Sequence, residues 1–90
     1  MEKLLELPVS LHGLRVGNVV DVILDRSEGL PMGLEVRCLD GRHRFLPMAA
    51  ATPVGSEVVI DSPFALLETD ELEFYRGRGV SLRRRREPAA

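Results

Sequence analysis

Three polar residues that could do chemistry stand side by side near the middle of the chain: Arg42, His43 and Arg44, followed by a Phe-Leu-Pro ending. Guanidinium groups bind phosphates and carboxylates, and an imidazole can move protons near neutral pH. Catalysis by His43 would also need a nucleophile or a second acid–base group within reach. The sequence contains no Gly-x-Ser-x-Gly, phosphate-binding loop or paired-histidine motif to supply one. We therefore expect no catalytic residue, and we interpret Arg42 and Arg44 as solvent-facing contacts for a partner or an anion.

The other residues with metal-binding or nucleophilic side chains do not form a recognisable set. Asp21 and Asp25 share a strand face about 13 Å apart, which is too far for one metal ion or a shared proton. We interpret Asp21 as structural, accepting hydrogen bonds or pairing with an arginine. Cys38 is the only cysteine, so it cannot form an internal disulfide. We expect neither a metal nor a cofactor.

The C-terminal arginines are the least ordinary feature of the sequence: Arg83, Arg84, Arg85 and Arg86 are adjacent. Residues 1–75 carry six basic and thirteen acidic side chains, a net −7, whereas residues 76–90 carry six arginines and one glutamate, a net +5. Such a run can bind RNA, a lipid surface or an acidic protein, or it can simply keep the chain soluble. Few aromatic side chains are present to stack bases, so nucleic acid is the less favoured partner.

Short strands must position these residues. Alternating apolar and polar side chains with Gly and Pro between them predict strands over residues 4–12, 16–25, 33–39, 42–47, 57–61 and 64–67. Pro8 indicates an edge strand, and Asp40-Gly41 indicates a hairpin turn. Period two turns Phe45 inward and His43 either inward or toward the barrel rim. One or two helical turns are expected after residue 69, and residues 83–90 are expected to be a disordered tail.

The strand over residues 16–25 is apolar on both faces, which predicts that something covers its second face. A chain of 90 residues buries a small core, so a second subunit would add stability. We therefore expect a homodimer with a seam at Val19, Val20, Ile23 and Val59.

Short motifs in these strands resemble the PRC-barrel family: "GNVVDVILD" at 17–25, "GLEV" at 33–36 and "FLP" at 45–47. The residues that carry the resemblance, over roughly residues 10–67, are Gly17, Val19, Asp21, Gly33, Val36 and Pro47. The resemblance implies a small, mostly antiparallel β-barrel. Gly17, Asp21, Gly33 and Pro47 would then have structural roles. The family includes half of a ribosome maturation factor, the cytoplasmic part of a photosynthetic reaction-centre subunit, and stand-alone members whose roles are adaptor-like or unknown.

The sequence shows neither an RNA-processing domain before the barrel nor a membrane anchor, so we expect neither of the two well-known family functions. The composition, 44% hydrophobic and 29% charged, is that of a globular protein, and no apolar run approaches the ~20 residues that span a bilayer. We predict an all-β, five- to six-stranded barrel domain over residues 1–82. Its expected function is that of a cytoplasmic, non-enzymatic protein-binding adaptor. The alternative is a ribosome- or RNA-associated factor that uses the basic tail.

Overall fold

The computed structural model describes residues 2–86 and contains one curled sheet with two α-helices. The strands are β1 (Pro8–Leu11), β2 (Leu14–Asp25), β3 (Pro31–Cys38), β4 (His43–Pro47), β5 (Thr52–Val54), β6 (Glu57–Ile60) and β7 (Gly79–Ser81). The helices are α1 (Thr69–Arg78) and α2 (Leu82–Arg86), with short 3₁₀ turns η1 (Glu2–Leu4), η2 (Met48–Ala50) and η3 (Pro63–Ala65).

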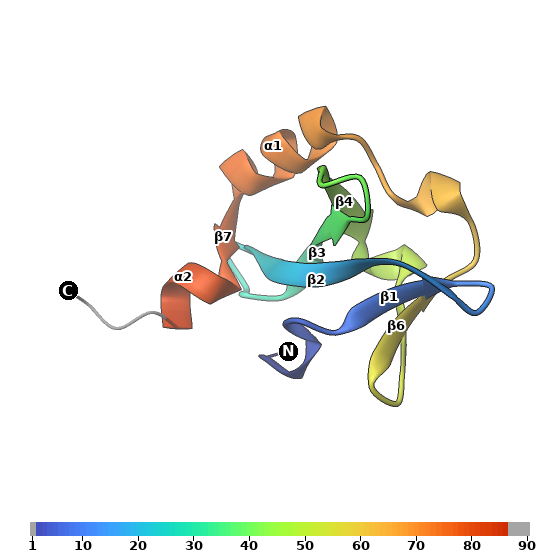
Figure 1. Cartoon of the computed structure of the whole chain (residues 1–90). Coiled ribbons are helices and arrows are strands. Elements are labelled where there is room, and N and C mark those ends of the chain that lie inside the picture. The colour runs from blue at the N-terminus through green and yellow to red at the C-terminus, as the bar shows by residue number, and fades with distance from the viewer. Residues whose placement is uncertain (1, 87–90) are drawn as a thin grey trace.

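The strands are ordered β4-β3-β2-β1-β6-β5, and β7 pairs with the C-terminal part of β2 (Figure 1). Every pair is antiparallel except β1 with β6. In the described chain, the outermost strands β4 and β5 do not pair with each other, so the sheet curls without closing. The predicted small, mostly antiparallel barrel is confirmed, with seven strands where five or six were expected.

The main core lies inside the curl of the sheet and is almost entirely aliphatic. Its fully buried members are Val9, Val19, Val22, Leu24, Leu34, Val36, Leu46, Val58 and Ile60. A β-bulge in β2 determines which of its side chains face the core. Val19 pairs with Val36, whereas Asp21, two residues further along, pairs with Glu35, the residue next to Val36. The extra residue, Val20, shifts the alternation, so Asp21 faces outward and Val22 faces inward.

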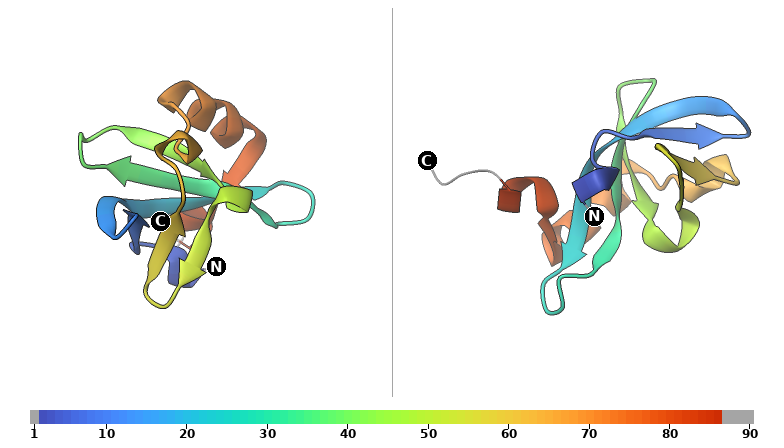
Figure 2. Two further views of the ribbon diagram at one scale, coloured as in Figure 1. Left: turned by 90° about the vertical axis from the view of Figure 1, so that its right-hand side faces the viewer. Right: turned by 90° about the horizontal axis from the view of Figure 1, so that it is seen from below.

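A second, smaller core lies on the outer face of the sheet, beneath α1. Ile23, Phe45 and Leu72 are each buried there, and the Tyr75 ring stacks on Phe45 with centroids 4.3 Å apart. Figure 2 shows α1 on one side of the β2–β3 pair and the β5–β6 hairpin on the other. The second apolar face of β2 is therefore covered by the chain's own helix α1.

This covering corrects two predictions. Val19 and Ile23 are fully buried within one chain, so they cannot form the predicted dimer seam, whereas Val20 and Val59 are partly exposed. Phe45 and His43 do share a face, but it is the helix-covered outer face, and Leu46 points into the main core instead. Period two alone cannot say which face of a strand lies inside when both faces are covered.

Three strand predictions were also wrong. Residues 63–65 form η3, where Ser62 Oγ accepts the Phe64 N–H, so 64–67 is not a strand. The exposed strand β5 was missed because Pro53 has no backbone N–H to donate to a sheet, which argues against a strand in the sequence. Pro8 does not mark an edge, since β1 lies between β2 and β6, and β6 pairs only from Val9 onward.

Gly33 permits the two cores to approach each other, which gives a stability prediction. A Cβ at Gly33 would lie 2.3 Å from Phe45 Cζ and 2.7 Å from the Leu46 carbonyl oxygen. We expect Gly33→Ala to lower the free energy of unfolding by about 1–3 kcal/mol, because the stacked Phe45 ring cannot yield.

The matched control is Gly77→Ala in α1, where a Cβ meets nothing within 4 Å. There we expect a gain of up to ~1 kcal/mol, since alanine favours the helix. Urea denaturation measures both, and equal stabilities for the two variants would contradict this packing.

Candidate functional site

Two buried carboxylates face each other across the β2–β3 pair and organise the polar contacts of the outer face. Asp21 and Glu35 are direct cross-strand partners, exposed by only 8% and 7%. Like charges opposite each other on one sheet face destabilise it, and a buried charge needs a partner. Both carboxylates therefore require donors from elsewhere in the chain.

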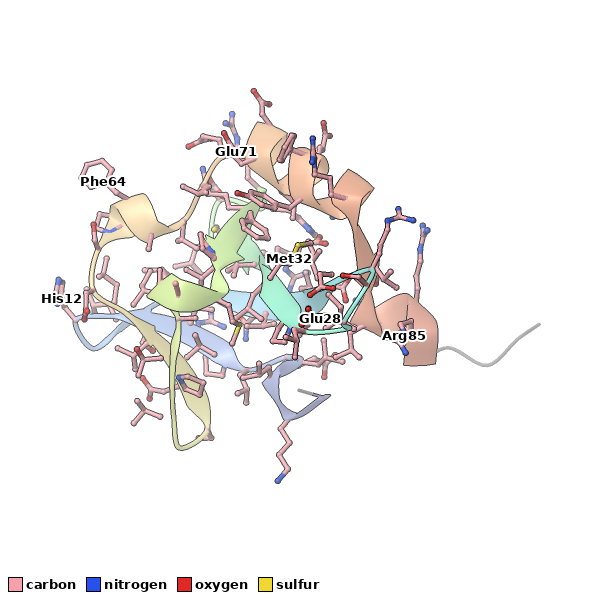
Figure 3. All side chains as sticks on the ribbon, turned by 180° about the vertical axis from the view of Figure 1, so that it is seen from behind. His12, Glu28, Met32, Phe64, Glu71 and Arg85 are labelled. Atoms are coloured by element: carbon pink, nitrogen blue, oxygen red, sulfur yellow. The ribbon has the colours of Figure 1, made fainter. Side chains whose placement is uncertain are left out.

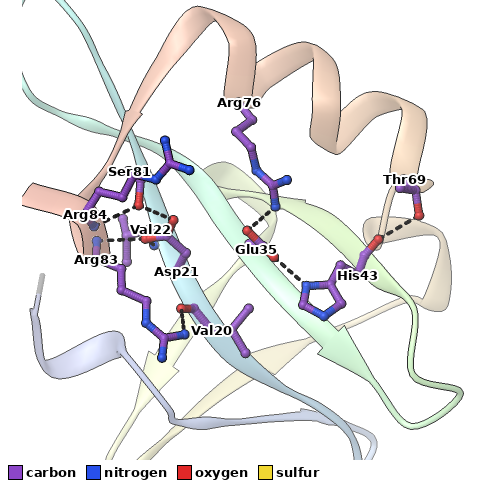
Figure 4. A network of polar contacts seen from close by, with 10 residues as sticks. All are labelled: Val20, Asp21, Val22, Glu35, His43, Thr69, Arg76, Ser81, Arg83 and Arg84. Carbon is purple, nitrogen blue, oxygen red and sulfur yellow. Dashed lines mark hydrogen bonds and ion pairs between the residues drawn. The ribbon is translucent and has the colours of Figure 1, made fainter.

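Residues from α1 and β4 satisfy Glu35. Its Oε1 accepts a hydrogen bond from Arg76 Nη2, and its Oε2 contacts His43 Nδ1 (Figure 4). The Thr69 hydroxyl donates to the His43 carbonyl oxygen at 2.8 Å, which fixes the start of α1 on β4. His43 is thus a positioning residue in a carboxylate network. Within residues 2–86 no serine, threonine or cysteine side chain is hydrogen-bonded to its ring.

The segment after α1 satisfies Asp21. Its Oδ1 accepts the Arg83 N–H at 2.9 Å and the Val22 N–H at 2.8 Å, while its Oδ2 accepts the Ser81 hydroxyl. The Arg84 N–H bonds in turn to Ser81 Oγ at 3.1 Å (Figure 4). Asp21 consequently caps the first turn of α2 and secures it to β2.

These contacts correct the prediction that a disordered tail begins at residue 83. Residues 83–86 continue α2, and Leu82, exposed by 8%, packs into the main core. Arg83, Arg84 and Arg85 are exposed. The Arg86 side chain and residues 87–90 lie outside the described residues, so the prediction for that stretch has no outcome here.

Arg42 and Arg44, which were both predicted to contact a partner, have different surroundings in the structure. Arg42 is exposed, but Arg44 donates to both carboxylate oxygens of Asp40, at 2.9 and 3.2 Å. The Arg44 hydrogen bonds, together with the Arg42 N–H, lower the pKa of Asp40 from its usual value, and Asp40 raises the pKa of Arg44. Arg44 is therefore already paired within the chain, and Asp40 stays charged at neutral pH.

An open apolar groove of about 880 Å³ lies beside this pair, between the β3–β4 turn and the segment that leads into α1. Two large side chains stand exposed in it, Phe64 by 87% and Leu39 by 66%. We call this feature the groove. Its lining comprises Val16, Cys38, Leu39, Asp40, Arg44, Pro63, Phe64, Leu66, Leu67, Glu68, Asp70 and Glu71.

The rim of the groove is acidic. Asp40, Glu68, Asp70 and Glu71 border it, and Arg44, already bound to Asp40, is the single cation in its lining. The sequence did not reveal this site, because its apolar residues come from a turn and from a 3₁₀ segment that was expected to be a strand. Only the fold brings Leu39 and Phe64 together.

A second, more polar pocket of about 540 Å³ lies beside the two carboxylates, and Arg26, Arg76 and Arg84 contribute to its lining. Among residues 2–86, no three His, Cys, Asp or Glu side chains gather to hold a metal ion. No helix in the same residues has the length and apolar character that crossing a bilayer requires. Gly17 and Gly33 have packing roles. A Cβ at Gly17 would lie 2.6 Å from the Arg37 carbonyl oxygen, and a Cβ at Gly33 would meet the Phe45 ring. Pro47 ends β4.

The Glu35 network makes a prediction about how the C-terminal segment is held. We expect Glu35→Ala to lower the free energy of unfolding by about 1–3 kcal/mol, because Arg76 and His43 both lose their acceptor. Arg76→Ala should then cost much less in the Glu35→Ala background than it does in the native background, since its carboxylate partner has already been removed.

The control for this prediction is Glu73→Ala, an exposed glutamate of α1. Urea denaturation of the four variants provides the measurement. Strictly additive effects of Glu35→Ala and Arg76→Ala would show that the pair is not coupled.

Comparison with known proteins agrees with the architecture. The family model of the PRC-barrel domain matches residues 6–67, and no curated protein matches the sequence. The matched residues include β1 to β6 and the groove residues up to Leu67, whereas α1, β7 and α2 follow the matched part. On the strength of this match over most of its length, the chain belongs to the PRC-barrel domain family.

Proposed function

We propose that the chain is a non-enzymatic protein-binding module whose groove accepts an apolar segment with flanking basic side chains. The observation that carries this proposal is the groove itself, where Phe64 and Leu39 stand exposed inside an acidic rim. Exposed apolar side chains with a polar border are typical of interaction sites. The carboxylates of the rim favour lysine and arginine beside the apolar anchors.

The remaining polar groups support a binding role over catalysis. His43 and Glu35 form the one histidine–carboxylate pair of the described residues, and Glu35 is shared with Arg76. Glu35 holds α1 on the sheet through Arg76, and the His43 carbonyl oxygen accepts the Thr69 hydroxyl at the start of α1. PRC-barrel domains often mediate protein interactions, which agrees with this role. The cytoplasmic location expected from the sequence remains part of the proposal.

The homodimer expected from the sequence also remains a prediction, but its seam must differ from the one expected. Val19 and Ile23 are covered by the chain itself. A twofold dimer that joins groove to groove would bring two sets of four rim carboxylates together, and such like-charge contact is unfavourable. Self-association therefore needs a basic surface opposite the groove.

The test uses two fluorescent peptides with the same leucine and phenylalanine residues, one flanked by lysines and the other by glutamates. We expect the lysine peptide to bind more tightly, with an affinity that falls as salt is added. Phe64→Ser or Leu39→Ser should weaken its binding about tenfold or more, because each removes a large apolar contact.

Val54→Ser is the matched control, since Val54 is 53% exposed but lies outside the groove. Fluorescence anisotropy measures the affinities. Equal binding of the two peptides, or native affinity in both groove variants, would refute the proposed function.

A further inference from the structure

A basic surface lies at the end of the molecule that carries α2, and it has the chemistry that the groove requires of an occupant. Arg84 and Arg85 are exposed on α2, and Arg26 lies on the adjoining β2–β3 turn. The Arg85 guanidinium reaches that turn, because a Cβ built on Gly29 would lie 3.9 Å from Arg85 Nη1. Leu30, exposed by 55%, follows in the same turn. We call these four side chains the basic face.

The arginines of the basic face are not neutralised by ion pairs within residues 2–86. The buried carboxylates are already bound by Arg76, His43, Ser81 and the Arg83 N–H. In residues 2–86, no carboxylate forms an ion pair with Arg26, Arg84 or Arg85. Of the nearby acids, Asp25 accepts the Glu28 N–H, which lowers its pKa, and Glu28 is the remaining exposed carboxylate of the turn. Arg26 Nη2 donates to the Gly77 carbonyl oxygen at 3.2 Å, so it is the guanidinium groups of Arg84 and Arg85 that remain available to a partner.

The basic face and the groove are complementary in both charge and polarity. The basic face presents one apolar side chain among arginines, whereas the groove presents Phe64 and Leu39 among carboxylates. An arginine can also stack on an exposed aromatic ring. The chain already contains such a contact, with the Arg78 guanidinium 4.5 Å from the centroid of the Phe74 ring.

The two surfaces lie at opposite ends of one molecule. Figure 3 shows Arg85 and Phe64 on opposite sides of the fold, whose longest dimension is 38 Å. A single chain therefore cannot bring its own basic face to its own groove, whereas a second copy can.

We propose that the groove accepts the basic face of a second copy of this chain. This inference rests on the proposed function of the groove and names its partner. Arg84 and Arg85 of one copy pair with Asp70 and Glu71 of the next, and Leu30 lies against Phe64. The contact joins two different surfaces, so it produces either an antiparallel pair with two equal contacts or an open chain of copies.

Two variants, each with two charged side chains replaced by uncharged ones, test this contact. The measurement is light scattering at low ionic strength and micromolar concentration. The first, Asp70→Asn with Glu71→Gln, lacks the two rim carboxylates of the proposed contact but keeps its basic face. The second, Arg84→Gln with Arg85→Gln, lacks the two arginines of the proposed contact but keeps its groove. We expect the native chain to exceed single-chain mass, and each variant alone to be a single chain. A mixture should restore a two-chain species, because one intact contact remains between them.

The matched control, Asp61→Asn with Glu73→Gln, neutralises two exposed carboxylates outside the groove lining and should associate like the native chain. Circular dichroism checks that all variants fold. A native chain of single mass, or a mixture that stays monomeric, would overturn the inference.

The peptide test above separates the two claims. Tight binding of the lysine peptide to a strictly monomeric chain would leave the proposed function intact and reject only the second copy as partner. Retention of a single-stranded RNA by the native chain, lost in Arg84→Gln with Arg85→Gln while native mass stays single, would assign the basic face to nucleic acid and also reject this inference.

Discussion

Two carboxylates buried side by side on one face of the sheet are the constraint on which the rest of the structure depends. Asp21 and Glu35 face each other across β2 and β3, where water is largely excluded and each would destabilise the other if left unpaired. Their donors come from α1, β7 and α2, all C-terminal to the residues that match the family. The β-sheet therefore cannot present a stable outer face without the C-terminal segment, and that segment is part of the domain.

The same arrangement leaves the two ends of the molecule with opposite character. Docking of α1 places Glu68, Asp70 and Glu71 at the rim of the groove, while docking of α2 gathers arginines at the other end. The charge asymmetry of the sequence thus becomes a spatial asymmetry of the fold. The interior of this small domain is filled by aliphatic side chains. The binding that we propose therefore uses the outer surfaces at these two ends.

The sequence predicted the strands well where apolar and polar side chains alternate. Alternation located β3 and β6, the Asp40-Gly41 turn located the β3–β4 hairpin, and acids followed by arginines located α1. The sequence was less informative for β2, where both faces are apolar. It indicated a cover for the second face of β2 but not that Val19 lies in the main core, nor that the cover over Ile23 is the chain's own helix α1. Arg83 shows the same limit, because its role lies in a backbone N–H that no side-chain pattern reveals. The groove was beyond reach for a similar reason, since Leu39 and Phe64 meet only through tertiary structure.

Amide hydrogen exchange is the most direct measurement of the central claim that buried carboxylates hold the C-terminal segment on the sheet. The Arg83 N–H bonds to Asp21, and the Val19 N–H bonds to the Leu7 carbonyl oxygen in the sheet. If the segment is integral to the fold, the Arg83 amide exchanges slowly, with protection close to that of Val19. Exchange of Arg83 at the rate of an unstructured peptide, with Val19 still protected, would show that the sheet stands without this segment and would contradict the account.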